Sequence, residues 1–241
     1  MPFDPAALVL AMAISAGAAM LQGVVGFGYA LIAVPALALI DPRLAPVPQM
    51  LTALPLTLLM AWRERADIDV PGVTWVVAGR FVGLAAGAGL VAVANRQLMD
   101  VLIGASVVAG VACVAARGGV TRTSGIDMAA GVFSGASGYV SGIGGPPLAL
   151  LYHGTRGATI RATLAALFAL GLVLTLATRA VLGQVSALDL QAGAVLLVPV
   201  LVGTWASRFL HAGTEGGPLR TATLVLSAVA GLGLLWRAVA G

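Results

Sequence analysis

Two glycine clusters decide how this chain folds: Gly23-Val24-Val25-Gly26-Phe27-Gly28 near its start, and Gly138-Tyr139-Val140-Ser141-Gly142-Ile143-Gly144-Gly145-Pro146-Pro147 past its middle. Each cluster lies within a long apolar stretch, residues 6–40 and residues 126–153. As straight helices these stretches would measure about 52 Å and about 42 Å at 1.5 Å per residue, whereas a bilayer core is about 30 Å thick. We therefore predict that each stretch is two helices, broken at its glycines.

The composition around these clusters is that of a membrane protein. Hydrophobic residues make up 60% of the 241 residues and charged residues only 9%, which a soluble fold of this length could not bury. The apolar stretches are continuous rather than alternating, so helices are favoured over barrel strands. Besides the two long ones they span residues 46–62, 71–94, 98–116, 158–182, 187–209 and 218–239. We predict an all-α polytopic membrane protein, a helical bundle forming one transmembrane domain over residues 1–241.

The charged residues indicate topology rather than a charged partner. All 13 basic residues are arginines, and most of them lie between apolar stretches, so the formal charge of +4 does not indicate a nucleic-acid partner. The single Cys113 excludes a disulfide framework and a cysteine metal cluster. We expect no metal and no cofactor, and the oligomeric state stays open.

The two glycine clusters also indicate an internal duplication. Three pairs of matching residues recur 116 to 121 positions apart: Gly26-Phe27-Gly28 with Gly142-Ile143-Gly144, Val82-Gly83 with Val202-Gly203, and Gly110 with Gly231. Such duplication is common in secondary transporters. We predict pseudo-symmetric repeats over about residues 1–120 and 121–241.

The arginines suggest that the two repeats are inverted. If each broken stretch is re-entrant, so that it enters the bilayer and returns to the same side, four arginines lie on one side: Arg43, Arg96, Arg179 and Arg237. Arg80 is set aside because it falls within an apolar stretch. The remaining eight arginines then lie on the other side, which satisfies the positive-inside rule. Three net crossings per repeat invert the second repeat and place both termini outside.

A broken helix in a membrane is a candidate anion site. The half-helix that follows a break begins with unpaired N–H groups at the positive end of its dipole. Here these N-termini are expected near residues 27–29 and 144–147, where glycine permits close approach and Pro146 suits a first helical turn. The candidate substrate-binding residues from the clusters are Gly26, Phe27, Gly28, Gly142, Gly144, Gly145 and Pro146. For the small-residue pairs outside the clusters, Gly79/Gly83/Gly87 and Gly131/Gly135, helix packing is the favoured interpretation.

Polar residues near the breaks complete the predicted site. The primary candidates are Gln22, Ser137, Ser141, Arg161 and Thr163, and the secondary candidates are Gln49, Thr52 and Arg80. Arg161 is favoured because a guanidinium can bind an oxyanion through two parallel hydrogen bonds, although it also suits an anchor at the inner surface. The alternative for each amide and hydroxyl is a hydrogen bond to a neighbouring helix.

Carboxylates do not suggest a coupling-ion site. Asp41, Asp100, Asp127 and Asp189 all lie at the ends of apolar stretches, so no buried-carboxylate site for a proton or sodium ion is predicted. Anion export from an inside-negative cell does not require one, because each negative charge that leaves gains about 2.3 kcal/mol per 100 mV.

The glycine clusters, together with the residues that follow them, resemble the sulfite exporter TauE/SafE family, also called the sulfonate uptake permease (TSUP) family. The similar residues include 29–35, Leu148-Ala149-Leu150-Leu151-Tyr152, Arg161-Ala162-Thr163-Leu164 and Val202-Gly203-Thr204, so the resemblance extends over essentially the whole chain. It implies transport of sulfite, thiosulfate, sulfoacetate or other organosulfonates across the bacterial inner membrane. With the broken helices it favours an exporter that binds its anion near the bilayer midplane and works by alternating access.

Two other functions are compatible with parts of this sequence. An anion channel would have the same composition and the same glycine breaks. An enzyme is the second alternative, because Gly135-Ala136-Ser137-Gly138 resembles the nucleophile motif of rhomboid intramembrane proteases. A serine nucleophile needs a base within hydrogen-bond reach, and both histidines, His153 and His211, follow Ser137 and lie at stretch ends. We therefore expect no catalytic residues.

Overall fold

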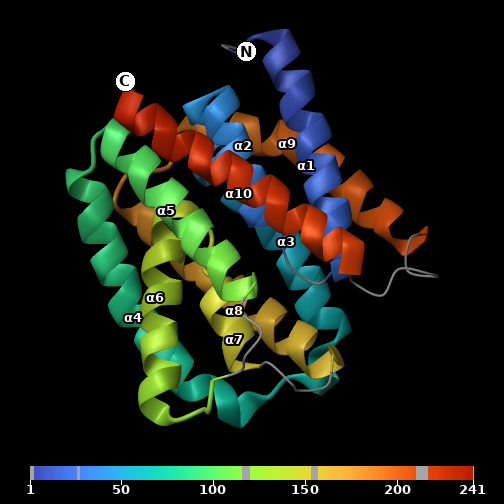
Figure 1. Ribbon diagram of the computed structural model, residues 1–241, viewed down its shortest axis with the longest axis vertical. Helices are drawn as coiled ribbons and strands as arrows, with labels where there is room; N and C mark the ends of the chain where they lie inside the picture. The colour runs from blue at the N-terminus through green and yellow to red at the C-terminus, as the bar shows by residue number, and fades with distance from the viewer. Residues whose placement is uncertain (1–2, 26–27, 116–119, 153–156, 210–216, 241) are drawn as a thin grey trace.

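The chain folds as a bundle of helices. The computed structural model describes residues 3–25, 28–115, 120–152, 157–209 and 217–240, and within these ranges there is no strand (Figure 1). Its α-helices are α1 (Pro5–Val25), α2 (Tyr29–Ile40), α3 (Val47–Arg63), α4 (Val70–Val93), α5 (Arg96–Ala115), α6 (Ser124–Ser141), α7 (Pro146–Leu151), α8 (Gly157–Val181), α9 (Ala187–Ala206) and α10 (Gly217–Ala240). Three short 3-10 helices join them: η1 (Pro42–Leu44), η2 (Arg65–Asp67) and η3 (Ser207–Phe209). The all-α prediction is confirmed.

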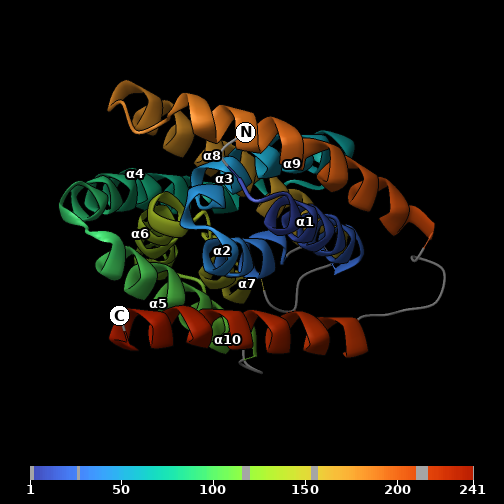
Figure 2. The ribbon, with the colours of Figure 1, turned by 90° about the horizontal axis from the view of Figure 1, so that it is seen from above.

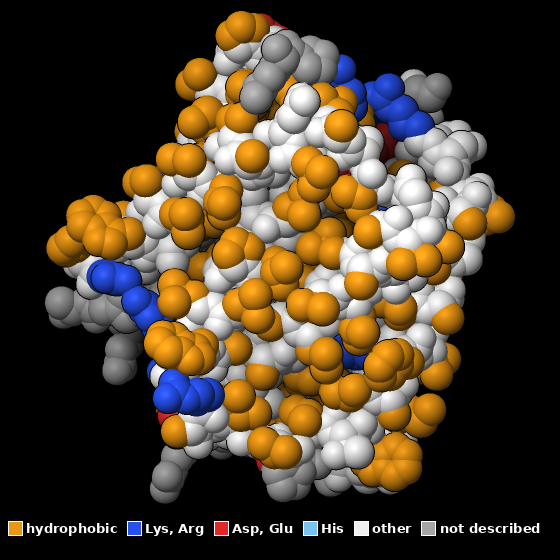
Figure 3. All heavy atoms as spheres, turned by 180° about the vertical axis from the view of Figure 1, so that it is seen from behind, with side chains coloured by type: hydrophobic (Ala, Val, Ile, Leu, Met, Phe, Trp, Pro, Cys, Tyr) orange, Lys and Arg blue, Asp and Glu red, His pale blue; other side chains and the backbone are white. Residues whose placement is uncertain are grey.

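The helices have the dimensions of a polytopic membrane protein. In the described part of the chain, seven are long and apolar enough to cross a bilayer, and they belong to α1, α3, α4, α5, α8, α9 and α10. Large apolar side chains such as Val181 and Trp236 are 86% and 74% exposed, and hydrophobic side chains spread over most of the face in Figure 3. Apolar surface of this extent requires lipid.

Both long apolar stretches are broken at their glycines, as predicted. The first helix ends at Val25 and α2 begins at Tyr29, with Gly28 between them at φ 117°. The second ends at Ser141, is followed by Gly142 at φ 73°, and resumes as α7. Both φ values are left-handed, a conformation that glycine adopts without steric penalty and other residues avoid. Whether the broken stretches are re-entrant in the bilayer stays a prediction.

The helices pack in a pattern that is preserved when the two predicted repeats are exchanged. The first half of each broken stretch packs on a helix of the other repeat, α1 on α9 and α6 on α4. The second halves do the same, α2 on α10 and α7 on α5, while α3 packs on α8 and α5 on α10. Seen from above, α9 and α10 flank the bundle on opposite sides, with α2 and α3 between them (Figure 2). The duplication and its inversion remain predictions that this pattern supports.

Glycine brings α4 and α6 into backbone contact. A Cβ at Gly135 would lie 2.5 Å from the Arg80 carbonyl oxygen, and a Cβ at Gly79, Gly83 or Gly131 would overlap the backbone of the facing helix. These glycines form the small-residue pairs noted in the sequence, and their role here is close helix packing. The contact also fixes the position of Arg80 within α4.

Candidate functional site

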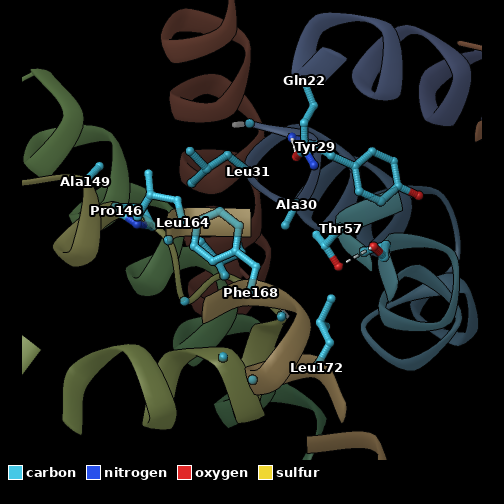
Figure 4. Close-up of a pocket in the computed structure, with 18 of the residues that line it drawn as sticks. Gln22, Tyr29, Ala30, Leu31, Thr57, Pro146, Ala149, Leu164, Phe168 and Leu172 are labelled. Carbon is cyan, nitrogen blue, oxygen red and sulfur yellow. Dashed lines mark hydrogen bonds between the residues drawn. The ribbon is translucent and has the colours of Figure 1, made fainter. Parts of the chain in front are cut away.

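A cavity lies where the two broken helices meet. Its walls come from the ends of both breaks and from α3, α4 and α8 (Figure 4). Seven of the predicted residues line it together: Gln22, Gly28, Gly142, Gly144, Gly145, Pro146 and Arg80. The cavity therefore collects most of the residues predicted from the glycine clusters.

Arg80 places a positive charge in this cavity. The residue is 5% exposed, and a Cβ at Gly144 or Gly138 would lie 3.5 or 3.8 Å from its Nη2. A Cβ at Gly171 would overlap the guanidinium itself, so only glycine at that position of α8 leaves room for it. Its Nη1 has no hydrogen-bond partner, and no ion pair among the described residues includes Arg80. A buried guanidinium with a free donor is suited to bind an anion.

The first break offers hydrogen-bond donors next to this charge. The Tyr29 N–H donates to Gln22 Oε1 at 2.9 Å, so the side chain before the break caps the helix after it (Figure 4). The next two residues of α2, Ala30 and Leu31, also line the cavity. Their N–H groups lie in the first turn, where the helix supplies no acceptor and its dipole is positive.

The second break forms part of the cavity wall but offers few hydrogen-bond donors to a ligand. The Ser134 hydroxyl donates to the Gly144 carbonyl oxygen at 2.5 Å and holds the loop against α6. The six-residue α7 begins with two prolines, which have no N–H, and a Cβ at Gly145 would lie 2.8 Å from Cζ of Phe168. The two breaks therefore differ, because the N-terminus of α2 keeps its donors and that of α7 is covered by an aromatic ring.

Four of the described primary candidates lie outside the cavity lining, and three of them form contacts elsewhere in the protein. Arg161, 44% exposed at its side chain, forms an ion pair with Glu64 through Nε and Oε1, 3.1 Å apart. The Ser137 hydroxyl donates to the Phe133 carbonyl oxygen at 2.7 Å, within its own helix. The Thr163 hydroxyl accepts from the Asp69 N–H at 3.0 Å. The Ser137 bond stays within α6 and the Thr163 bond reaches the segment before α4, so neither is the bond to a neighbouring helix that the sequence offered as an alternative.

The remaining described candidates lie next to the breaks but outside the cavity lining. The Ser141 hydroxyl accepts from the Ile143 N–H at 3.3 Å. The Thr52 and Tyr29 hydroxyls share a hydrogen bond of 2.6 Å. The Gln49 amide is fully buried beside Gly142 without a hydrogen-bond partner for either polar atom. Gly26 and Phe27 lie outside the described residues.

Sequence reasoning missed the contribution of α8. Phe168, Gly171, Leu172 and Thr175 line the cavity along one face of this helix. Gly171 carried a usable signal, because an isolated glycine within a long helix costs about 1 kcal/mol relative to alanine and needs a reason in packing or function. That reason is the guanidinium of Arg80.

Comparison with known proteins bears on the whole chain. The family model described as "Sulfite exporter TauE/SafE" matches residues 10–234, a range that contains both breaks and every described residue lining the cavity. Searches among curated proteins and among solved structures found no match. The family is one of membrane transporters of sulfur anions, in agreement with the apolar helices and the buried cation. The chain belongs to the sulfite exporter TauE/SafE family.

Proposed function

We propose that this protein is a secondary transporter that exports a sulfur-containing oxyanion, such as sulfite or an organosulfonate, across the bacterial inner membrane. The proposal places the anion in the cavity between the two breaks. The observation that carries it is Arg80, a buried guanidinium with a free donor in a cavity whose other walls are mostly apolar. A charged residue within a membrane bundle destabilises the protein by several kcal/mol, so such a residue marks a functional site.

Three groups bind the anion in this proposal. Arg80 supplies the charge, and the first turn of α2 supplies the N–H groups of Ala30 and Leu31. Gln22 is the third group, since its Oε1 accepts from Tyr29 and its amide nitrogen still has two N–H groups to donate. Arg161, the arginine favoured from the sequence, has its carboxylate partner at the surface and takes no part.

Alternating access follows from which helices pack together. In this proposal α1 packs on α9 and α2 on α10, while α6 packs on α4 and α7 on α5, so each moving body combines helices from both repeats. The two bodies stay joined where α5 packs on α10. One break belongs to each body, so the cavity lies between the bodies. Rocking of one body against the other would open the cavity to one side and then to the other.

A thermal-shift titration of the purified protein tests the proposal. Sulfite, thiosulfate, sulfoacetate and sulfate are compared with carboxylates at equal ionic strength. At least one sulfur oxyanion should raise the melting temperature of the wild type and of Arg161→Gln, because a ligand stabilises the state that it binds. It should not raise that of Arg80→Gln. An equal shift in Arg80→Gln would refute the site.

The direction of transport needs a second measurement. Inside-out membrane vesicles that contain the protein should take up the anion, and the uptake should saturate and show counter-transport. Conductance without saturation would contradict the carrier and support a channel.

A further inference from the structure

The cavity contains one positive charge and few other groups that could balance the charge of a bound anion. Among the described residues that line it, Arg80 is the only charged side chain. Arg179, also buried, donates to the Tyr139 carbonyl oxygen at 2.7 Å and stacks on the Tyr139 ring, outside the lining. Arg122, nearer the surface, forms ion pairs with Asp69 and Asp127. The ligand therefore meets a single guanidinium.

The helix dipoles do not supply a second charge. The N-terminus of α2 contributes only about half a positive charge, and one of its donors, the Tyr29 N–H, already has Gln22 as its acceptor. The N-terminus of α7 lacks donors at its two prolines, and the Phe168 ring covers Gly145. The remaining walls are mostly apolar side chains such as Leu31, Ile143 and Leu172, with the uncharged hydroxyl residues Thr57 and Thr175 among them.

A single charge in such surroundings discriminates between anions by their charge. The free energy lost when an ion leaves water rises with the square of its charge, whereas its attraction to one guanidinium rises only in proportion. A monoanion at Arg80 is neutralised. For a dianion the free-energy cost of leaving water is about four times larger, and one of its negative charges has no partner in the cavity.

We infer that the site accepts oxyanions of single charge and rejects dianions. The inference rests on the proposed function and adds the charge state of the substrate to it. Hydrogen sulfite would be bound rather than the sulfite dianion. An alkyl or aryl sulfonate with no second charge would be bound as well, its uncharged part lying against Leu31, Phe168 and Leu172.

Calorimetric titration of the wild-type protein with methyl sulfate and with sulfate isolates this charge effect. The two anions share a sulfate group, and methylation removes one negative charge. At one pH and one ionic strength, methyl sulfate should bind at least about tenfold more tightly than sulfate. Equal affinities, or tighter binding of sulfate, would overturn the inference.

A second positive charge in the cavity should shift the anion preference towards sulfate. Thr57 lines the cavity from α3, so Thr57→Lys should raise the affinity for sulfate relative to methyl sulfate. The control Thr74→Lys adds the same charge at an exposed position of α4 and should leave the ratio unchanged. An unchanged ratio in a folded Thr57→Lys protein would count against the inference.

The outcomes separate the two claims. If sulfate and methyl sulfate bind equally to the wild type and Arg80→Gln binds neither, the charge selection is wrong and the anion site stands. If the wild type binds no sulfur oxyanion, both claims are wrong.

Discussion

Replacing Gly171 by alanine moves the functional charge with little effect on the fold. The added Cβ would overlap Nη2 and Cζ of Arg80 and lie 3.0 Å from its Nε. Since non-bonded atoms settle about 3.5 Å apart, the guanidinium must withdraw by about 2 Å. If the charge moves from about 4 Å to about 6 Å from the anion, their attraction falls from about 4 to about 3 kcal/mol at an effective dielectric of 20. That difference corresponds to about a tenfold weaker Kd.

The stability of Gly171→Ala should change little. Alanine favours a helix over glycine by about 1 kcal/mol, and the atoms that must move belong to the end of a flexible side chain. Calorimetric titration with the tightest-binding anion gives the Kd, and thermal denaturation monitors the fold. Gly89→Ala is the matched control, because it lies on α4 with Arg80 and its Cβ would meet nothing within 4 Å. A wild-type Kd in Gly171→Ala would refute the contact or the role of Arg80.

Three other variants test the packing, an ion pair between the bodies and the electrostatics of the cavity. Gly83→Val should reduce the free energy of unfolding by about 1–3 kcal/mol or more and so lower the melting temperature, because its side chain would overlap the backbone of α6. Gly89→Val is the control, since a Cβ at Gly89 has open space. Asp100→Asn should cost about 1–3 kcal/mol in thermal denaturation, since it breaks the bidentate pair in which Arg237 joins α10 to α5 at 2.6 and 2.8 Å. Adding Arg237→Gln should then cost less than the sum of the two single changes. Gln22→Glu keeps the oxygen that accepts from Tyr29 and adds a negative charge, so calorimetry should show anion affinity reduced by at least about tenfold.

The helices and their breaks could be predicted because they follow from length and local chemistry. A stretch of residues 6–40 is too long for one span, and a glycine cluster within it marks where the helix ends. The structure ends α1 at Val25 and α6 at Ser141, which are separated by the same 116 residues as the matching glycine motifs. Such arguments need no knowledge of which helices touch.

The site could be predicted only in part, because its charge depends on helix rotation. Arg80 and Arg161 both occur within apolar stretches, and in lipid an apolar helix has no polar face that would show which way an arginine points. Contact between α4 and α6 at Gly135 and space at Gly171 direct Arg80 into the cavity. Arg161 instead meets Glu64, distant in sequence. These are tertiary contacts, and the single sequence contains no record of them.

Anomalous diffraction from crystals of the protein soaked in selenite, the selenium analogue of sulfite, tests the central claim most directly. We predict a selenium peak between the two breaks, within hydrogen-bond reach of the Arg80 guanidinium, that is lost in crystals of Arg80→Gln. Selenium found only at surface arginines such as Arg161, with none beside Arg80, would contradict the account.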